Sequence, residues 1–174
     1  MGAVNKPRVS RAVAGAYLGF SIVVAAMGLS FIYLGYKTPA GMSMSIAGLL
    51  VLVLVEPLFI LILRSLFRTR YILTDSDLQI EATRLIGGGR RVPLGNIESV
   101  ERTLIPFGIR LFGASLHGGY YYVPGLGRAY LIITNFDDGL LLRGGKEIYI
   151  ITPRDPLGFK ELLESKIVSK KGQP

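Results

Sequence analysis

The sequence contains no cysteine and no tryptophan, and it has a single histidine, His117, among 174 residues. The lack of cysteine excludes disulfide bonds, thiolate nucleophiles and cysteine-based zinc or iron–sulfur sites. A single histidine excludes a histidine-rich metal site and argues against catalysis centred on histidine. Charged residues make up only 18% of the chain, whereas about 25% is usual in a soluble domain. This shortage argues against an ordinary cytosolic protein. Asparagine and glutamine are rare as well, a pattern typical of heat-adapted proteins.

Two long uncharged stretches dominate the first part of the chain. The first, residues 12–36, would form a helix about 37 Å long, enough to cross a hydrocarbon core of about 30 Å with some tilt. The second, residues 42–63, is interrupted only by Glu56 and Pro57. Between them Pro39 and Gly41 predict a turn. We therefore predict a transmembrane helical hairpin over residues 12–66, after a cytoplasmic tail over residues 1–11. A cleaved signal peptide is the alternative, although its apolar part should span only about 7–15 residues.

Basic residues flank these stretches unevenly. Residues 1–70 hold seven basic residues and one acid, Glu56. Three basic residues precede the first stretch, one lies in the turn, and Arg64, Arg68 and Arg70 follow the second stretch. The positive-inside rule then predicts a multi-pass protein of the plasma membrane with both termini in the cytoplasm. Phe67 and Tyr71 would lie near the inner interface of the membrane.

Two features inside the predicted spans suggest specific contacts. Gly15 and Gly19 are four residues apart, which lets helix backbones approach closely in lipid. They predict helix packing, either against the second span or against another subunit. Glu56 lies inside the second span, where a carboxylate costs about 2.5–3.5 kcal/mol to insert. It is a candidate for proton or ion relay, or a residue that is protonated or hydrogen-bonded to a neighbouring helix.

The remainder of the chain predicts a small β domain over residues 71–168, followed by a polar tail over residues 169–174. Period-two alternation and β-forming residues predict short antiparallel strands. The expected strands cover residues 71–74, 78–82, 90–94, 97–104, 129–134, 139–143 and 147–151. Gly144-Gly145 predicts a hairpin between the last two strands. Asp155 and Pro156 then predict the start of a closing helix. Its expected apolar face consists of Leu157, Phe159, Leu162, Leu163 and Ile167.

Motifs in this second part resemble a known family. They are Tyr-Ile-Leu-Thr-Asp-Ser-Asp-Leu at 71–78, Val-Pro-Leu at 92–94 with Ile-Glu-Ser-Val at 97–100, the glycine-rich segment 112–120, and Thr-Pro-Arg-Asp-Pro at 152–156 before Phe159. Behind two transmembrane helices, this order is similar to that of membrane-anchored bacterial and archaeal PH-like domain proteins. The resemblance implies an α+β membrane protein whose PH-like domain is a seven-stranded β-sandwich or barrel with a C-terminal helix. It implies no enzyme, and phosphoinositide binding is not carried over from eukaryotic PH domains.

The stretch from Leu104 to Gly127 is the most unusual part of the β domain. It is rich in glycine and aromatic residues, and Arg110 is its only formal charge. Long excursions of this kind can be binding loops, and tyrosine suits both a protein partner and a membrane interface. Core and hairpin packing, partner contact and lipid contact therefore remain alternatives. The candidate partner-contact residues are Arg110, Phe112, His117, Tyr120 and Tyr121.

Arginines supply the second group of candidates. Residues 87–91, Gly-Gly-Gly-Arg-Arg, superficially suggest a phosphate loop, but they lack a Gly-Lys-Ser/Thr ending, so a turn between strands is expected. Arg90 and Arg91, with Arg64, Arg68 and Arg70, can meet anionic lipid headgroups. For Arg90 and Arg91 the alternative is a solvated face. For the other three, setting membrane orientation is sufficient explanation.

These observations favour a non-catalytic, membrane-anchored scaffold or accessory subunit, with membrane lipids and other membrane protein subunits, or further copies of itself, as partners. An anionic-lipid-binding module at the inner leaflet is the first alternative, and a transport component using Glu56 is the second. No cofactor or metal is expected. Nucleic acid is not expected as a partner, because residues 71–174 hold 13 basic and 11 acidic residues, which leaves the folded part nearly balanced.

Overall fold

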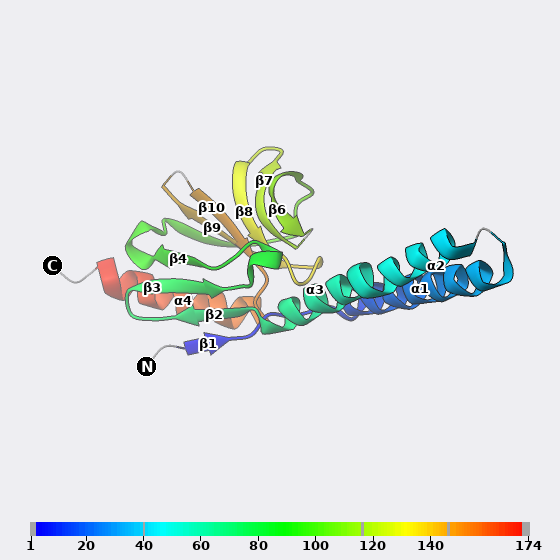
Figure 1. Cartoon of the computed structure of the whole chain (residues 1–174). Coiled ribbons are helices and arrows are strands. Elements are labelled where there is room, and N and C mark those ends of the chain that lie inside the picture. The colour runs from blue at the N-terminus through cyan, green and yellow to red at the C-terminus, as the bar shows by residue number, and fades with distance from the viewer. Residues whose placement is uncertain (1–2, 40, 116, 146, 172–174) are drawn as a thin grey trace. The chain divides into compact units, whose positions relative to one another are not determined.

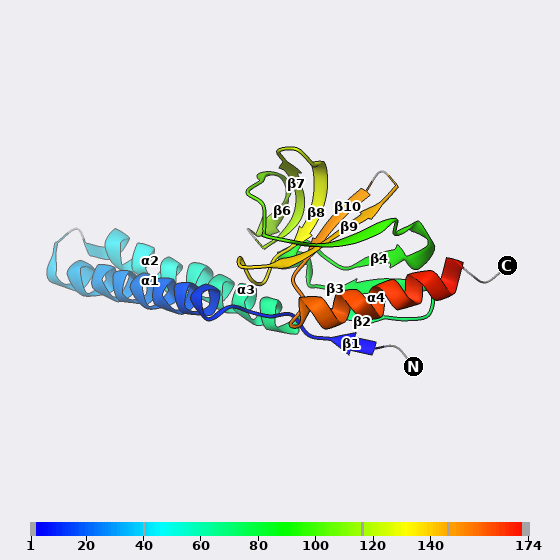
Figure 2. The ribbon, with the colours of Figure 1, turned by 180° about the vertical axis from the view of Figure 1, so that it is seen from behind.

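The computed structural model describes residues 3–39, 41–115, 117–145 and 147–171, without the side chains of residues 112–115 and 171. The chain divides into two compact units (Figures 1 and 2). One unit is helical and covers residues 11–64. The other joins residues 1–10 to residues 65–174 and holds the sheets and the last helix. Each unit is described separately below.

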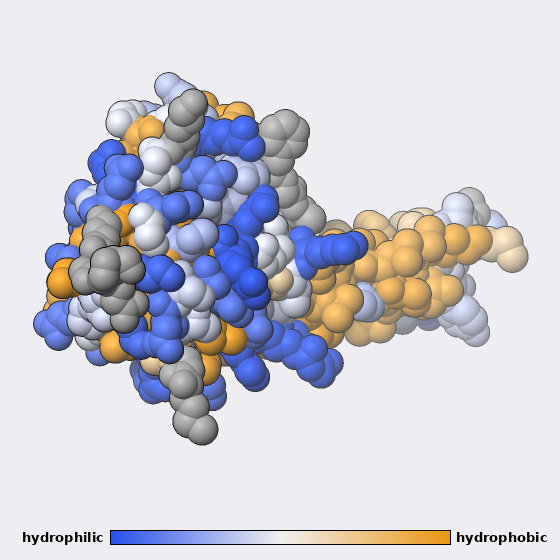
Figure 3. All heavy atoms as spheres, turned by 90° about the vertical axis from the view of Figure 1, so that its left-hand side faces the viewer, coloured by the Kyte–Doolittle hydropathy of each residue, from blue (hydrophilic) through white to orange (hydrophobic). Residues whose placement is uncertain are grey.

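Two spans form the helical unit. The first is α1 (Arg11–Lys37), and the second runs through α2 (Gly41–Leu50), the π-helical turn η1 (Val51–Val55) and α3 (Glu56–Arg68). By length and composition both are able to cross a membrane. Only 17% of the most apolar 18-residue segment of the first span, and 6% of that of the second, is buried. A core helix of a soluble protein would be mostly buried. In Figure 3 the visible surface of these helices is predominantly hydrophobic.

Just before Glu56 and Pro57, which interrupt the second uncharged stretch, the helix takes the form of the π-helical turn. The backbone N–H of Glu56 donates to the carbonyl of Val51, five residues earlier. Pro57 has no N–H to donate, so a regular ladder cannot continue through this position. A one-turn π-bulge of this kind absorbs the mismatch without ending the helix.

Glycines bring the two spans together, although not the glycines expected. A Cβ added at Gly28 would lie 2.8 Å from Leu52 Cγ, and one at Gly48 would collide with the Gly28 carbonyl. Gly35 and Gly41 meet in the same way near the turn. By contrast, a Cβ at Gly15 or Gly19 would have no neighbour within 4 Å among the described residues. Packing of Gly15 and Gly19 against the second span is therefore wrong, and only their contact with another subunit stays a prediction.

The second unit is a β-sandwich of two sheets and one helix. The four-stranded sheet has the order β1 (Ala3–Asn5), β2 (Arg70–Leu73), β3 (Asp77–Glu81) and β4 (Arg90–Pro93), all antiparallel. The six-stranded sheet has the order β5 (Ser99–Thr103), β9 (Gly139–Gly144), β10 (Glu147–Ile151), β8 (Gly127–Ile132), β7 (Gly118–Val123) and β6 (Ile109–Ser115). Short 3-10 turns η2 (Arg84–Ile86) and η3 (Leu94–Asn96) flank β4, and α4 (Pro156–Lys171) ends the unit.

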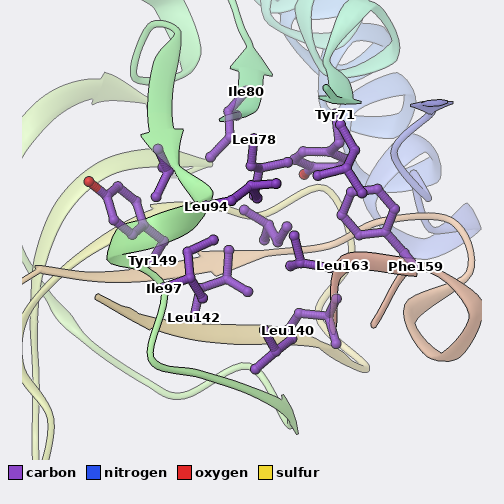
Figure 4. Packing of buried hydrophobic residues seen from close by; sticks show 14 of the residues in the cluster. Tyr71, Leu78, Ile80, Leu94, Ile97, Leu140, Leu142, Tyr149, Phe159 and Leu163 are labelled. Carbon is purple, nitrogen blue, oxygen red and sulfur yellow. The ribbon is translucent and has the colours of Figure 1, made fainter. Parts of the chain in front are cut away.

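The core lies between the sheets and α4. Tyr71 and Phe159 pack at one end of it, with ring centroids 6.3 Å apart, and Tyr149 lies at the other end (Figure 4). The Asp155 carboxylate accepts a bond of 3.0 Å from the Gly158 N–H, so the expected N-cap of α4 is confirmed. Leu163 of α4 is fully buried in the same cluster.

Several expectations about this unit need correction. The two sheets do not close into a barrel, and they contain more strands than the seven implied by the resemblance. β10 enters between β9 and β8, so it pairs antiparallel with β9 but parallel with β8. The predicted tail over residues 1–11 instead supplies β1 and then pairs along residues 152–154. Leu157 and Leu162 are exposed on α4 because they fall on its outer side.

Candidate functional site

Three tyrosines form a row across the inner face of the six-stranded sheet. Tyr120 of β7 is paired in register with Tyr130 of β8, and Tyr130 is paired in register with Tyr149 of β10. Neighbouring strands place paired side chains on the same face. The rings meet edge to face, with centroids 5.2 Å apart between Tyr120 and Tyr130 and 6.1 Å apart between Tyr130 and Tyr149. This is a favoured geometry for aromatic pairs.

Two arginines stack on this row. Arg128 lies two residues before Tyr130 on β8, and its Cζ is 4.1 Å from the centroid of the Tyr120 ring. Arg90 reaches the row from β4 of the other sheet. Its Cζ is 4.9 Å from the Tyr130 centroid and 5.4 Å from the Tyr120 centroid, and its Nη2 donates to the Tyr120 hydroxyl over 3.1 Å. Cation–π contacts of this kind contribute about 0.5–1 kcal/mol each at exposed sites.

A glycine turn fixes the central tyrosine. The Tyr130 hydroxyl donates towards the carbonyls of Gly87 and Gly88, at 3.0 and 2.6 Å. Gly87 has a φ of 105°, a left-handed conformation that glycine adopts without strain. A Cβ on Gly118 of β7 would collide with the Ile86 carbonyl, so the turn also needs a glycine opposite it. The expected turn between strands at residues 87–89 is confirmed.

These residues border a hollow of about 230 Å³, lined by Tyr120, Arg128, Tyr130, Glu147, Ile148 and Tyr149. We call this hollow, together with Arg90, the Arg–Tyr pocket. Tyr149 donates its hydroxyl hydrogen to the Glu147 carboxylate. Burial, and then the hydrogen bond and charge of Glu147, raise the pKa of Tyr149, so its hydroxyl stays protonated. Burial also raises the pKa of Tyr130, and the charge of Arg90 opposes that rise.

The chemistry of the Arg–Tyr pocket is that of anion recognition. Among the described residues, neither Arg90 nor Arg128 forms an ion pair with an acidic side chain. Stacking on tyrosine holds each guanidinium in a set plane while leaving edge N–H groups for an acceptor. A guanidinium presents a fork that matches a carboxylate or a phosphate. The pocket therefore offers two oriented cations. The hydroxyl hydrogens of Tyr130 and Tyr149 are already donated, to the carbonyls of the glycine turn and to the Glu147 carboxylate at the edge of the pocket.

The geometry of a sandwich capped by a C-terminal helix agrees with a sequence comparison. Residues 69–167, more than half of the chain, match the profile of a family described as Bacterial PH domain. The chain belongs to the bacterial PH domain family. Comparisons with curated proteins and with solved structures found no significant match. A PH domain is generally a non-catalytic binding module. Across the part of the chain that the structure describes, no three His, Asp or Glu side chains gather as a metal site.

This bacterial PH domain separates the two arginines that the sequence paired. Consecutive residues of a strand point to opposite faces, so Arg90 enters the Arg–Tyr pocket and Arg91 points away from it. The guanidinium of Arg91 lies 3.9 Å from the Asp77 carboxylate and is 69% exposed. Arg64, Arg68 and Arg70 are exposed as well, and none joins the pocket.

The predicted partner-contact loop is mostly a hairpin of the bacterial PH domain, formed by β6 and β7. His117 is 3% exposed and Tyr121 is 7% exposed, so both belong to the interior and neither can meet a partner in this state. Arg110 is half-buried and pairs in register with Tyr121. Tyr120 is the one candidate that reaches the pocket. The Phe112 side chain lies outside the described residues.

Glu56 of the helical unit has a structural partner. The Ser21 hydroxyl of α1 donates to its Oε1 over 2.5 Å, which is the expected alternative of a hydrogen bond to a neighbouring helix. Its Oε2 is buried without a partner among the described residues. No other acid, lysine, arginine or histidine occurs in residues 12–36 or 41–63. A proton relay within this helical pair would therefore lack a second group.

Sequence reasoning missed Arg128, Tyr130, Glu147 and Tyr149 as site residues. Tyr130, Glu147 and Tyr149 lie in segments that were predicted correctly as strands, and Arg128 lies one residue before the predicted start of its strand. The residue types alone do not distinguish a core tyrosine from a pocket tyrosine. The available signal was the alternation of Arg128 and Tyr130, which places both on one face of β8. It becomes informative only when the register with β7 and β10 is known.

Proposed function

We propose that this chain is a membrane-anchored scaffold or accessory subunit of a membrane protein complex. Its helical pair serves as the anchor, and its bacterial PH domain holds an acidic side chain of a partner in the Arg–Tyr pocket. The main support is the pair of stacked guanidiniums, Arg90 and Arg128, which have no acidic partner of their own in the described chain. Arginine and tyrosine are also the residue types that dominate binding energy at protein interfaces.

The anchor is supported by the apolar surface of the helices. Large side chains such as Leu18, Phe20 and Ile22 are more than half exposed on α1. A soluble protein rarely exposes a contiguous apolar surface of this extent. Burial in lipid accounts for this exposed apolar surface. The π-helical turn keeps the second span continuous through Pro57.

The test is purification of the full chain from native membranes in a mild detergent, with mass spectrometry of every co-eluting protein. We expect a stoichiometric partner with the wild type, and its loss with the double variant Arg90→Ala and Arg128→Ala. Arg91→Ala is the control for the Arg90→Ala change, because it removes one arginine charge from the next residue of β4 but lies outside the pocket. A monodisperse monomer from the wild type, or equal partner recovery from all variants, would contradict the proposal.

An anionic lipid is the alternative occupant of the same cations. Headgroup binding by Arg90 and Arg128, and by Arg64, Arg68 and Arg70 outside the pocket, would weaken with added salt. Native mass spectrometry of the detergent-solubilised chain distinguishes the two occupants. Retention of an anionic lipid by the wild type and by Arg91→Ala, but not by the double variant, would favour the lipid over a protein partner.

A further inference from the structure

The bacterial PH domain exposes four large apolar side chains at the end where the chain enters and leaves it. Phe67 is 59% exposed, Leu104 is 78% exposed, Phe107 is 87% exposed and Phe136 is 54% exposed. We call these four residues the apolar rim. Isolated exposed apolar residues are common, but a group of this size usually marks an interaction surface.

Contacts within the domain place Phe67, Leu104 and Phe136 near one another, and Phe107 lies in the same loop as Leu104, between β5 and β6. The Asp138 carboxylate forms ion pairs with Arg102 at 2.9 Å and with Arg8 at 3.9 Å, so it links the end of β5 to the N-terminal segment. Phe136 precedes Asp138 by two residues, and Leu104 follows Arg102 by two residues. Thr103 pairs with Gly139 in the same place. Phe67 and Arg8 line one hollow of about 290 Å³.

The same end of the domain carries both connections to the helices. The Ser10 N–H donates to the Thr134 carbonyl over 3.1 Å, and α1 begins at the next residue, Arg11. On the other side, Leu66 is fully buried within the domain although it belongs to α3, which ends at Arg68. No linker residue separates Ser10 from α1. If the helices cross a bilayer, this end of the domain is held at the surface of that bilayer.

Cations at this end complement a lipid surface. The hollow that contains Phe67 is also lined by Lys6, Arg8 and Arg154. Only Arg8 of these three has an ion pair in the described chain. An apolar wall beside cationic side chains matches the boundary between acyl chains and anionic headgroups. A soluble protein partner would not require the rim to lie beside the helix connections.

We infer that the apolar rim inserts into the interfacial layer of the bilayer that holds the helices, with Lys6, Arg8 and Arg154 facing its headgroups. The inference rests on the membrane anchoring proposed above and adds a second contact with the same lipid. The domain would then lie against the membrane instead of standing free on its anchor. This contact would also set which way the Arg–Tyr pocket faces.

The absence of tryptophan makes the test direct. The full chain is reconstituted in phosphatidylcholine–phosphatidylglycerol nanodiscs, with or without bromine on the acyl chains, as three single-tryptophan variants. Phe107→Trp probes the rim, Val168→Trp is a control on α4 at 72% exposure, and Phe20→Trp probes α1 at 55% exposure. We expect brominated lipid to quench Phe107→Trp and Phe20→Trp, whereas Val168→Trp is quenched only by aqueous acrylamide.

The other outcomes separate two kinds of failure. Quenching of Phe20→Trp without quenching of Phe107→Trp would overturn the inference and leave the anchor intact. Lack of quenching at Phe20→Trp would overturn the anchor itself. If Phe107→Trp is protected from both bromine and acrylamide, the rim contacts protein, either a partner or a second copy, and the inference is wrong. Phe136→Trp repeats the rim measurement on a different loop.

Discussion

Single side chains in this protein are held by partners that neighbouring strands supply. Tyr130 combines a ring packed edge to face against Tyr120, a cation above it from Arg90, and a hydroxyl that donates to the glycine turn. Tyr71 is buried, and burial raises its pKa to about 12, although its hydroxyl accepts a hydrogen bond from the Thr152 N–H. It was expected at the membrane interface, and the structure places it in the core instead. Tyrosine suits both the core and a membrane interface, so only the pairing of the strands shows which of the two Tyr71 occupies.

The lone histidine provides a test of burial at this scale. His117 is bound through Nδ1 to the Ile133 carbonyl at 2.9 Å, so Nδ1 is the protonated nitrogen of the neutral ring. Burial lowers the pKa of His117 below its ordinary value of 6.5, and the hydrogen bond offsets part of that shift. The unfolded chain therefore binds a proton below about pH 6.5 that the folded chain does not bind. Stability contributed by neutral His117 is complete above that pH and falls as the pH decreases.

We expect the thermal midpoint of the full chain in detergent to decrease between about pH 7 and pH 5.5. His117→Asn should flatten this dependence, because asparagine retains an N–H donor for Ile133 but does not titrate. Carboxylates contribute little in this window, since their ordinary pKa values are about 4. Parallel pH profiles for the two proteins would show that His117 is not the group responsible.

At the scale of elements, the sequence predicts most strands but not all of them. β2, β3, β4, β9 and β10 follow from alternation and from turn glycines, and the predicted hairpin of β9 and β10 is confirmed. The strands β6 and β7 were missed as such because glycines interrupt their pattern, and the pairing of β6 with β7 shifts register twice. β1 was missed because it is only three residues long. Its partner β2 follows both helices, and local sequence carries no information about a pairing at that distance.

The contact between the helical spans depends on glycines that the spacing rule did not select. Gly15 and Gly19 match the pattern of close packing, yet no described residue lies within 4 Å of a Cβ added at either position. Gly48, by contrast, lies against the Gly28 carbonyl. A small-residue spacing shows where a close approach is possible. Which glycines are used depends on the crossing point of the two helices, which the spacing rule does not give.

Two leucine substitutions separate these roles. Gly48→Leu should destabilise the helical pair by about 1–3 kcal/mol, because the new side chain has no space to occupy. Gly15→Leu should leave this pair intact. If the prediction of an external partner at Gly15 and Gly19 holds, Gly15→Leu should instead reduce association with a second chain. The measurements are the thermal midpoint in detergent and the mass of the detergent-solubilised particle. Equal destabilisation by both variants would contradict the observed packing.

At the scale of the whole molecule, the bacterial PH domain is built from segments on both sides of the helical unit in the sequence. The segment before α1 and the segment after α3 contribute neighbouring strands, since Ala3 to Asn5 pair with Tyr71 to Leu73. Composition and hydropathy predicted an anchor followed by a domain. They could not predict that residues before the helical unit complete a sheet of the domain that follows it, because this closure of the sheet depends on backbone pairing between residues some seventy positions apart in the sequence.

This closure leads to a prediction about membrane topology that does not depend on counting charges. Strands of one sheet must lie on the same side of a membrane, so β1 and β2 require an even number of crossings between them.

The sequence has no cysteine, so a single introduced thiol can be labelled without background. We expect a membrane-impermeant maleimide to label Val4→Cys and Ser169→Cys from the same side, and to label Thr38→Cys, in the turn after α1, only from the opposite side. The positive-inside rule further predicts that Val4→Cys and Ser169→Cys react in inverted vesicles and not in intact cells. Labelling of Thr38→Cys and Ser169→Cys from one side would mean that the helical pair does not cross the bilayer. Labelling of Val4→Cys and Ser169→Cys from opposite sides would be incompatible with the pairing of β1 and β2.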